Sequence, residues 1–148
     1  MPDLRECATV SGSKMMEYGR KTGELLQGHV ALVTGAAKRL GRAVALRLAE
    51  EGADVVIHYR SSEADARSAV AEIEKLGRRG SAIAAELTSV VDIKRLFDEA
   101  AKQFGRLDIL VNSAANFLPS SIVSTTEEIW DASLLLLVTT TLVNAPTL

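Results

Sequence analysis

The sequence predicts an α/β fold, a doubly wound parallel β-sheet with helices on both faces. Four short runs of β-branched and apolar residues alternate with amphipathic helices of roughly 10 to 16 residues, the pattern of strand–helix–strand units. Such units are right-handed and place their strands in parallel. The chain has 148 residues, is 47% hydrophobic and 24% charged, and carries a net charge of −2. This composition is that of one compact domain.

Composition also excludes several classes of protein. The longest apolar run, Leu134 to Val138, is far shorter than the roughly 18 residues that would cross a bilayer, and residues 1–20 lack the apolar core of a signal peptide. Cys7 is the single cysteine, which excludes a disulfide framework and favours a reducing, cytoplasmic compartment. The 17 basic and 19 acidic residues are dispersed, so we expect binding to neither nucleic acid nor membrane. The expected partner is a small molecule.

The first part of the chain divides into a leader and the start of the sheet. Residues 1–27 mix acids and bases without a helical or strand period, which predicts a mobile N-terminal leader. Residues 28–148 form the predicted domain. Its first strand is VALV with the following Thr-Gly, at 30–35, and is buried on both faces. A helix is expected from Leu40 to Gly52. Its predicted buried stripe is Leu40, Val44 and Leu48.

The pattern then repeats. A second strand is expected at 53–59, and Ser61-Ser62-Glu63 can start a helix that runs through Ala66, Val70, Ile73 and Leu76 to Gly77. A third, alanine-rich strand is expected at 80–87.

The last units follow the same rule. Thr88 or Ser89 is expected to cap a helix whose apolar stripe ends before Gly105. A fourth strand is expected at 107–112. Ser124 to Glu128 offer capping boxes for a final helix. Doubly wound sheets usually hold about six strands, so only the N-terminal half of such a domain is expected here. The fourth strand would then be an uncovered apolar edge.

The turn after the first strand carries the clearest chemical signal. Thr34-Gly35-Ala36-Ala37-Lys38-Arg39-Leu40-Gly41 leads directly from a buried strand into a helix. Gly35 permits a tight turn and Gly41 permits close packing of the helix on the strand, while the amides at the helix start suit a pyrophosphate. The sequence therefore predicts a Rossmann-type dinucleotide site.

The end of the second strand indicates which dinucleotide binds. Sites for an unphosphorylated ribose usually have an acid roughly 20 residues past the glycines. Here that region holds Arg60, flanked by Tyr59, Ser61 and Ser62. A guanidinium suits a 2′-phosphate, and Lys38 can help to neutralise it, so we expect NADP(H). The other interpretation of Arg60 is a solvated loop charge.

Four segments at successive strand ends together resemble the short-chain dehydrogenase/reductase family. They are TGAAKRLG at 34–41, HYRSS at 58–62, Glu86-Leu87-Thr88, and LVNSAANF at 110–117. The resemblance covers about residues 28–135. Arg39 replaces the middle glycine of the usual loop, which is similar to pteridine-reductase-like members. The resemblance implies hydride transfer from NADPH to a C=O or C=N bond of a small, pterin-like substrate, and it implies a homo-oligomer.

The family also implies individual roles. Thr34 and Asn112 would tie the first and fourth strands together, Leu87 and Thr88 would lie along the adenine, and Glu86 stands where the family usually has Asp. The residues expected to contact the cofactor are Gly35, Lys38, Arg39, Leu40, Gly41, Tyr59, Arg60, Ser61, Glu86, Leu87, Thr88, Asn112, Ser113 and Ala114. Those expected to contact the substrate are Arg39 and Phe117, although Phe117 also fits a loop aromatic packed on the core.

No catalytic residue is assigned from the sequence. The family's reaction needs a tyrosine followed by a lysine four residues later, but threonine follows Tyr18 and glutamate follows Tyr59 at that spacing. Residues 134–148 are leucine-rich and then threonine-rich, which fits truncation, alternative splicing or a frameshift. We therefore expect this chain alone to be inactive. The histidines and Cys7 show no metal-ligand spacing, so no metal is expected.

Two alternatives to an oxidoreductase remain open at this point. One is a non-catalytic nucleotide-binding or interaction protein that pairs its open fourth strand with another subunit. The other is a chain that does not fold stably by itself, because half of a doubly wound sheet leaves apolar surface uncovered.

Overall fold

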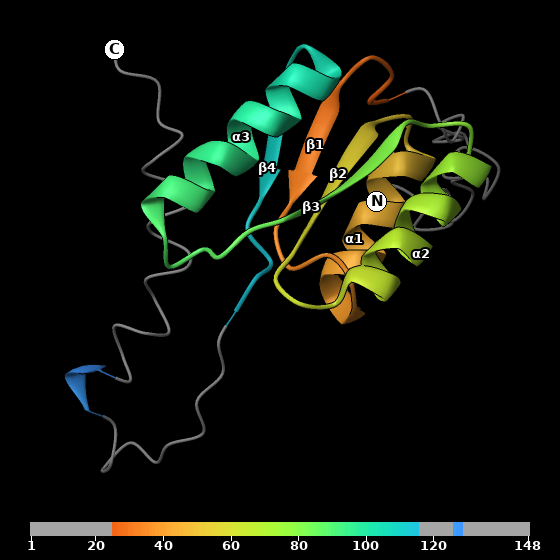
Figure 1. Cartoon of the computed structure of the whole chain (residues 1–148). Coiled ribbons are helices and arrows are strands. Elements are labelled where there is room, and N and C mark those ends of the chain that lie inside the picture. The colour runs from red at the N-terminus through yellow and green to blue at the C-terminus, as the bar shows by residue number, and fades with distance from the viewer. Residues whose placement is uncertain (1–24, 116–125, 129–148) are drawn as a thin grey trace, which may run out of the picture.

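A computed structural model describes residues 25–115 and 126–128 of the chain (Figure 1). Helices and strands alternate along the sequence, as the pattern predicts. The elements are β1 (Val30–Val33), α1 (Arg39–Glu50), β2 (Asp54–Tyr59), α2 (Glu63–Lys75), β3 (Gly80–Ala84), α3 (Val90–Phe104) and β4 (Ile109–Val111).

The four strands form one parallel sheet in the order β3-β2-β1-β4. In the register, Leu32 of β1 lies between Val56 of β2 and Leu110 of β4. The chain reverses its direction of winding at β1, which is the doubly wound arrangement. The predicted α/β Rossmann-type fold is therefore confirmed, and the carboxyl ends of all four strands meet at one edge of the sheet.

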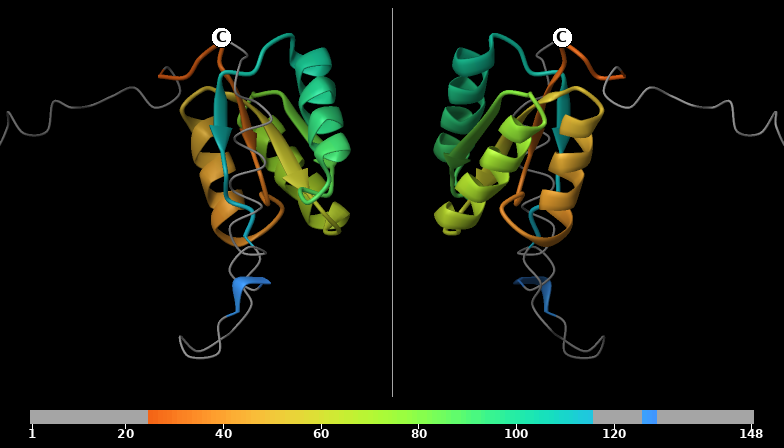
Figure 2. Two further views of the ribbon diagram at one scale, coloured as in Figure 1. Left: turned by 90° about the vertical axis from the view of Figure 1, so that its left-hand side faces the viewer. Right: turned by 90° about the vertical axis from the view of Figure 1, so that its right-hand side faces the viewer.

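Helices cover both faces of the sheet (Figure 2). On one face, Val33, Val55 and Ile57 pack against small residues of α1 and α2. On the other face, Leu32 and Val56 pack against α3. Alternate residues of each central strand thus enter opposite cores, which is why these strands read as continuous apolar runs.

The buried stripe of α1 differs from the predicted one. Leu40 is predicted to be buried, but it is 72% exposed. The residues buried on α1 are Gly41, Ala45 and Ala49. They lie one position further along the helix than the predicted stripe of Leu40, Val44 and Leu48, of which Val44 and Leu48 are half-buried. Because the helix axis approaches the sheet closely, small side chains face it and the larger ones flank the contact.

The other helices follow the prediction more closely. Ala66 and Ile73 are buried on α2, although Leu76 is 43% exposed at its end. Ser89 caps α3, its side chain accepting a hydrogen bond from the Asp92 amide, and Gly105 is the C-cap residue after the helix end at Phe104. Each helix ends one or two residues before a predicted stop glycine. The predicted last helix lies almost wholly outside the described residues.

Element boundaries shift by a few residues at the edges. Strand β3 ends at Ala84 and β4 covers only Ile109–Val111, so both are shorter than predicted. β4 is the edge strand of the described sheet and its residues are half-buried, as expected for an incompletely covered apolar edge. Leu26 lies within the predicted leader, yet its amide donates to the Glu51 carbonyl at 2.8 Å and its side chain packs on the core.

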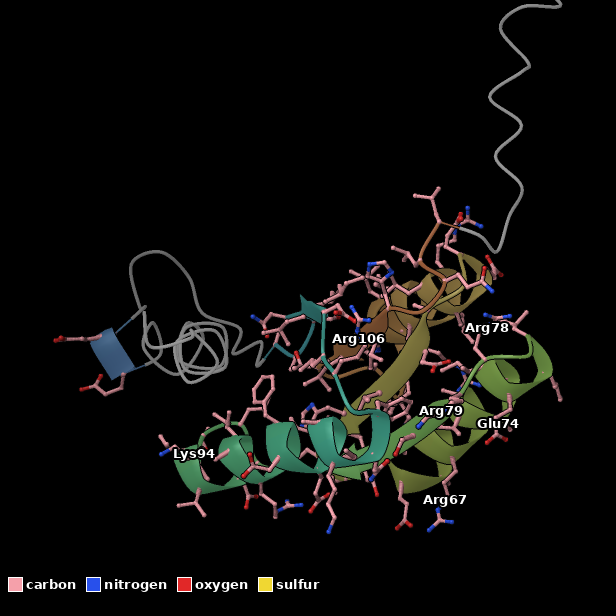
Figure 3. All side chains as sticks on the ribbon, turned by 90° about the horizontal axis from the view of Figure 1, so that it is seen from above. Arg67, Glu74, Arg78, Arg79, Lys94 and Arg106 are labelled. Atoms are coloured by element: carbon pink, nitrogen blue, oxygen red, sulfur yellow. The ribbon has the colours of Figure 1, made fainter. Side chains whose placement is uncertain are left out.

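Several arginines lie at the end of the sheet where the strands begin (Figure 3). The Arg79 guanidinium lies 4.4 Å from the centroid of the Phe104 ring and pairs with Asp54. Arg106 pairs with Asp108, whose carboxylate also accepts the Val30 amide at 2.8 Å. The Arg106 guanidinium and the Val30 amide lower the pKa of Asp108. These cations hold turns together, and they lie at the end opposite the cavity described below.

No helix within residues 25–115 and 126–128 combines the length and the apolar character needed to span a bilayer.

The position of the buried stripe on α1 can be tested by enlarging one alanine at a time. Ala45→Leu is expected to lower the free energy of unfolding by roughly 1–3 kcal/mol, because Ala45 is fully buried against the sheet and a larger side chain overfills that space. Ala43 is exposed on the same helix, so Ala43→Leu is expected to change the free energy of unfolding by less than about 0.5 kcal/mol. Urea unfolding followed by circular dichroism measures both values, and equal losses would contradict the assignment.

Candidate dinucleotide-binding site

A cavity of about 630 Å³ opens at the carboxyl edge of the sheet. Segments that follow β1, β2, β3 and β4 all contribute to its walls. The lining residues are Gly35, Ala37, Lys38, Arg39, Leu40, Gly41, His58, Tyr59, Arg60, Ser61, Ser62, Ala85, Glu86, Leu87, Ser113, Ala114 and Ala115. In doubly wound folds ligands bind at this edge, where the strand order reverses.

The floor of the cavity depends on two glycines. Gly35 has φ +64°, and a Cβ there would lie 2.8 Å from the Cα of Ala114. A Cβ on Gly41 would lie 2.6 Å from the Gly35 carbonyl oxygen and 3.0 Å from the Ser113 Oγ. Both contacts are mainly to backbone, which cannot move aside as the end of a flexible side chain can. Only glycine therefore lets the loop, α1 and the segment after β4 approach one another this closely.

The start of α1 faces this floor. Lys38 is the N-cap residue, and its side chain makes no capping hydrogen bond. The amides of a first helical turn have no partner within the helix, and the helix dipole makes this end electropositive. No acidic residue lies in the first turn of α1. The cavity therefore presents a surface suited to an anion.

Thr34 joins the glycine loop to the segment after β4. Its Oγ1 accepts hydrogen bonds from the Ser113 and Ala114 amides at 3.0 and 3.1 Å. Its own amide donates to the Val111 carbonyl at 2.9 Å. Thr34 is buried, so these bonds are shielded from water. They fix the distance between two walls of the cavity, which is the role that the resemblance implied for this residue.

His58 joins the loop to the segment after β3. The Gly35 amide donates to its Nδ1, and its Nε2 contacts the Ala85 carbonyl, both at 3.1 Å. The backbone carbonyl of His58 also accepts the Ala36 amide at 3.0 Å. Burial lowers the pKa of the His58 imidazole, while the Ala85 carbonyl and the Glu86 carboxylate partly oppose that effect.

Charged side chains surround the mouth of the cavity. Arg60 is well exposed after β2, and its nearest guanidinium nitrogen lies 4.0 Å from the Glu86 carboxylate. Lys38 pairs with Asp65 at 3.0 Å. Both ion pairs are solvent-exposed, a setting in which such pairs contribute little stability. These cations can therefore exchange their partners for a ligand at small cost.

The structure brings most of the predicted cofactor residues together. Thr88 and Asn112 do not line the cavity, and Phe117 lies outside the described residues. The lining residues that the sequence did not point to as cofactor contacts are Ala37, His58 and Ala85, while Ser62 and Ala115 line the cavity next to predicted contacts. The sequence does indicate that His58 is unusual, since it is a polar residue next to the end of a strand that is buried on both faces. Among residues 25–115 and 126–128, no cluster of three or more His, Cys, Asp or Glu is arranged to hold a metal ion.

Comparison with known proteins yields close relatives over most of the chain. The family model for short chain dehydrogenases matches residues 29–145. A hydroxynaphthalene reductase-like protein of Metarhizium robertsii is 43% identical over 116 residues, which are 78% of this chain and 43% of that protein. An uncharacterized oxidoreductase of Methylorubrum extorquens is 43% identical over 103 residues, 70% of this chain and 42% of that protein. The chain thus spans less than half the length of these relatives.

Solved structures agree with this assignment. A short chain dehydrogenase from Burkholderia cenocepacia in complex with NADP is 41% identical with a TM-score of 0.74, covering 82% of this chain and 51% of that one. A blue fluorescent protein from a metagenomic library, in complex with NADPH, is 34% identical with a TM-score of 0.73. The match covers 81% of this chain and 49% of that one. The chain belongs to the short-chain dehydrogenase/reductase family of oxidoreductases.

Proposed function

We propose that this chain binds NADP(H) in the cavity and supplies the cofactor-binding part of an oxidoreductase that acts on a C=O or C=N bond of a small substrate. The observation that carries the proposal is the approach of backbone to backbone at Gly35 and Gly41, which leaves the first turn of α1 open to a ligand. A diphosphate matches this surface because it offers several acceptors and negative charge to amides at a helix start.

The charges at the mouth favour the phosphorylated dinucleotide. Arg60 and Lys38 are exposed cations at the cavity, and Ser61 adds a hydroxyl beside them. A 2′-phosphate accepts paired hydrogen bonds from a guanidinium, whereas an unmodified ribose does not. Glu86 lies near Arg60 and would be displaced from it by the phosphate. Two of the similar structures contain NADP or NADPH, which supports the same choice.

The chemistry divides between cofactor and protein. When bound, the nicotinamide supplies the hydride. The described residues would hold the dinucleotide in place, with loop amides at the diphosphate, Arg60 at the 2′-phosphate, and Leu87 with Ala85 beside the adenine end. The small residues Ser113 and Ala114 leave room for close approach of the cofactor. The sequence contains no tyrosine with a lysine four residues later, so this chain by itself is proposed to bind without turnover.

A flat, pterin-like ring is the substrate class we propose, on the similarity of the Arg39-containing loop to pteridine-reductase-like members. Arg39 lines the cavity at the start of α1. We propose that its guanidinium faces both the diphosphate and a neighbouring substrate.

The preference for NADP(H) can be tested at Arg60. Arg60→Ala is expected to weaken NADP⁺ binding about 10- to 100-fold, because a charge-assisted hydrogen bond is worth roughly 1.5–3 kcal/mol. Binding of NAD⁺ should change by less than about threefold, since NAD⁺ lacks the phosphate that Arg60 contacts. Isothermal titration calorimetry measures the dissociation constants of both nucleotides for the wild type and the variant.

Arg67→Ala is the matched control for this experiment. Arg67 is an exposed arginine on α2 that pairs with Glu63 and points away from the ribbon (Figure 3). It does not line the cavity, so its removal should leave both affinities unchanged. Equal losses of NADP⁺ and NAD⁺ affinity in Arg60→Ala, or an equal loss of NADP⁺ affinity in Arg67→Ala, would contradict the assignment.

Arg39 offers a second test, because its backbone is strained. Its φ of +53° makes it the one non-glycine residue with positive φ among the described residues. A left-handed conformation costs an L-residue roughly 1–2 kcal/mol, so Arg39→Gly is expected to raise the free energy of unfolding by about 1 kcal/mol. The same change removes a cation from the cavity and should weaken NADP⁺ binding several-fold. Urea unfolding measures the change in stability, and calorimetry measures the change in NADP⁺ affinity. A variant less stable than the wild type would contradict the interpretation that the Arg39 backbone is strained.

A further inference from the structure

His58 is a buried polar residue for which neither the motif nor the proposed function accounts. It is 2% exposed, and with Thr34 it makes up the buried polar residues of the part that the structure describes. It is the last but one residue of β2, and its contacts reach the loop after β1 and the segment after β3. Burying an imidazole is costly unless both ring nitrogens have partners, and here both do.

The two contacts determine which nitrogen carries the proton. A backbone amide can only donate, so the Gly35 amide requires an unprotonated Nδ1. A backbone carbonyl can only accept, so the Ala85 carbonyl requires a proton on Nε2. The geometry therefore selects the neutral imidazole with its proton on Nε2. An imidazolium would present a second N–H to the Gly35 amide, placing two donors 3.1 Å apart.

We propose that neutral His58 is a positioning residue for the dinucleotide loop: it fixes the Gly35 peptide, and its protonation releases that peptide and weakens binding of the cofactor. This inference rests on the proposed function. The loop begins with two amides held by His58, Gly35 through the ring and Ala36 through the backbone carbonyl. The amides that follow form the start of α1, so the orientation of the Gly35 peptide sets the direction in which they point.

Charged groups from three segments share the cavity with His58. Lys38 and Arg39 from the loop and Arg60 from the end of β2 line it. The Glu86 carboxylate after β3 lines it too and favours the charged imidazole. Tyr59 is the remaining titratable neighbour in the cavity wall. Burial lowers the pKa of His58 below its ordinary 6.5. The fixed loop is therefore fully stabilised above pH 6.5 and loses this stabilisation as the pH falls through the lowered pKa.

The tautomer can be measured without any ligand. The chain has two histidines, and His29 is exposed, so it serves as the internal reference. Two-dimensional ¹H–¹⁵N spectra of the imidazoles at about pH 8 are expected to show His58 with a pyridine-like Nδ1 and a protonated Nε2. His29 should show rapid tautomer exchange. A proton on Nδ1 of His58 would overturn the proposal.

The coupling to binding is measured with His58→Asn. The Asn Oδ1 can take the place of Nδ1 and accept the Gly35 amide, but the side chain does not titrate. At about pH 8, His58→Asn should bind NADP⁺ more tightly than His58→Leu, because only the Asn side chain offers an acceptor to the Gly35 amide. Over the pH range in which the imidazole spectra show His58 becoming protonated, the wild type should lose at least about threefold more affinity than the variant. The 2′-phosphate titrates in this range too, so the difference between the two proteins is the relevant quantity.

Two further variants separate the possible outcomes. His29→Asn should keep the wild-type pH profile, and His58→Leu, which removes the acceptor, should bind NADP⁺ about tenfold more weakly at about pH 8. Circular dichroism checks that each variant is folded. If the wild type binds NADP⁺ but shares its pH profile with His58→Asn, this inference alone is overturned. If the wild type binds no NADP⁺ at about pH 8, the proposed function falls and the inference falls with it.

Discussion

The close approach of three backbone segments at the carboxyl edge of the sheet is the constraint on which the site depends. The loop after β1, the first turn of α1 and the segment after β4 meet where Gly35 and Gly41 leave no room for a Cβ. The Thr34 hydroxyl then ties the first and third of these segments together. Removing side chains in this way brings helical amides, rather than side-chain atoms, to the surface of the cavity.

Parallel strands gather the remaining functional groups at the same edge. Because β1 to β4 all point the same way, the residues that follow them share one cavity although they are far apart in sequence. The chain as a whole carries a net charge of −2, yet Lys38, Arg39 and Arg60 line this cavity with Glu86 as its lining acid. The distribution of charge, rather than its sum, makes the edge suitable for a phosphorylated ligand.

Local periodicity predicted the fold well, because strand and helix patterns in this chain are strong and alternate regularly. The same periodicity predicts a buried stripe on α1 one residue too early, because it favours the large apolar Leu40 over the smaller Gly41 and Ala45 that close packing requires. Most of the predicted cofactor residues line the cavity because motif and strand ends coincide. The contacts of His58 were not predictable, because they join residues 23 and 27 positions away along the chain. The same holds for the proximity of Arg60 to Glu86.

We propose that the amides at the start of α1 receive the diphosphate of NADP(H). A titration of ¹⁵N-labelled chain with NADP⁺, followed by amide chemical shifts, tests this contact. The largest shifts are expected on residues 35–41, and amides of the turn before β3, at the opposite end of the sheet, are expected to stay unmoved. Saturable binding that leaves residues 35–41 unshifted would contradict the proposed contact.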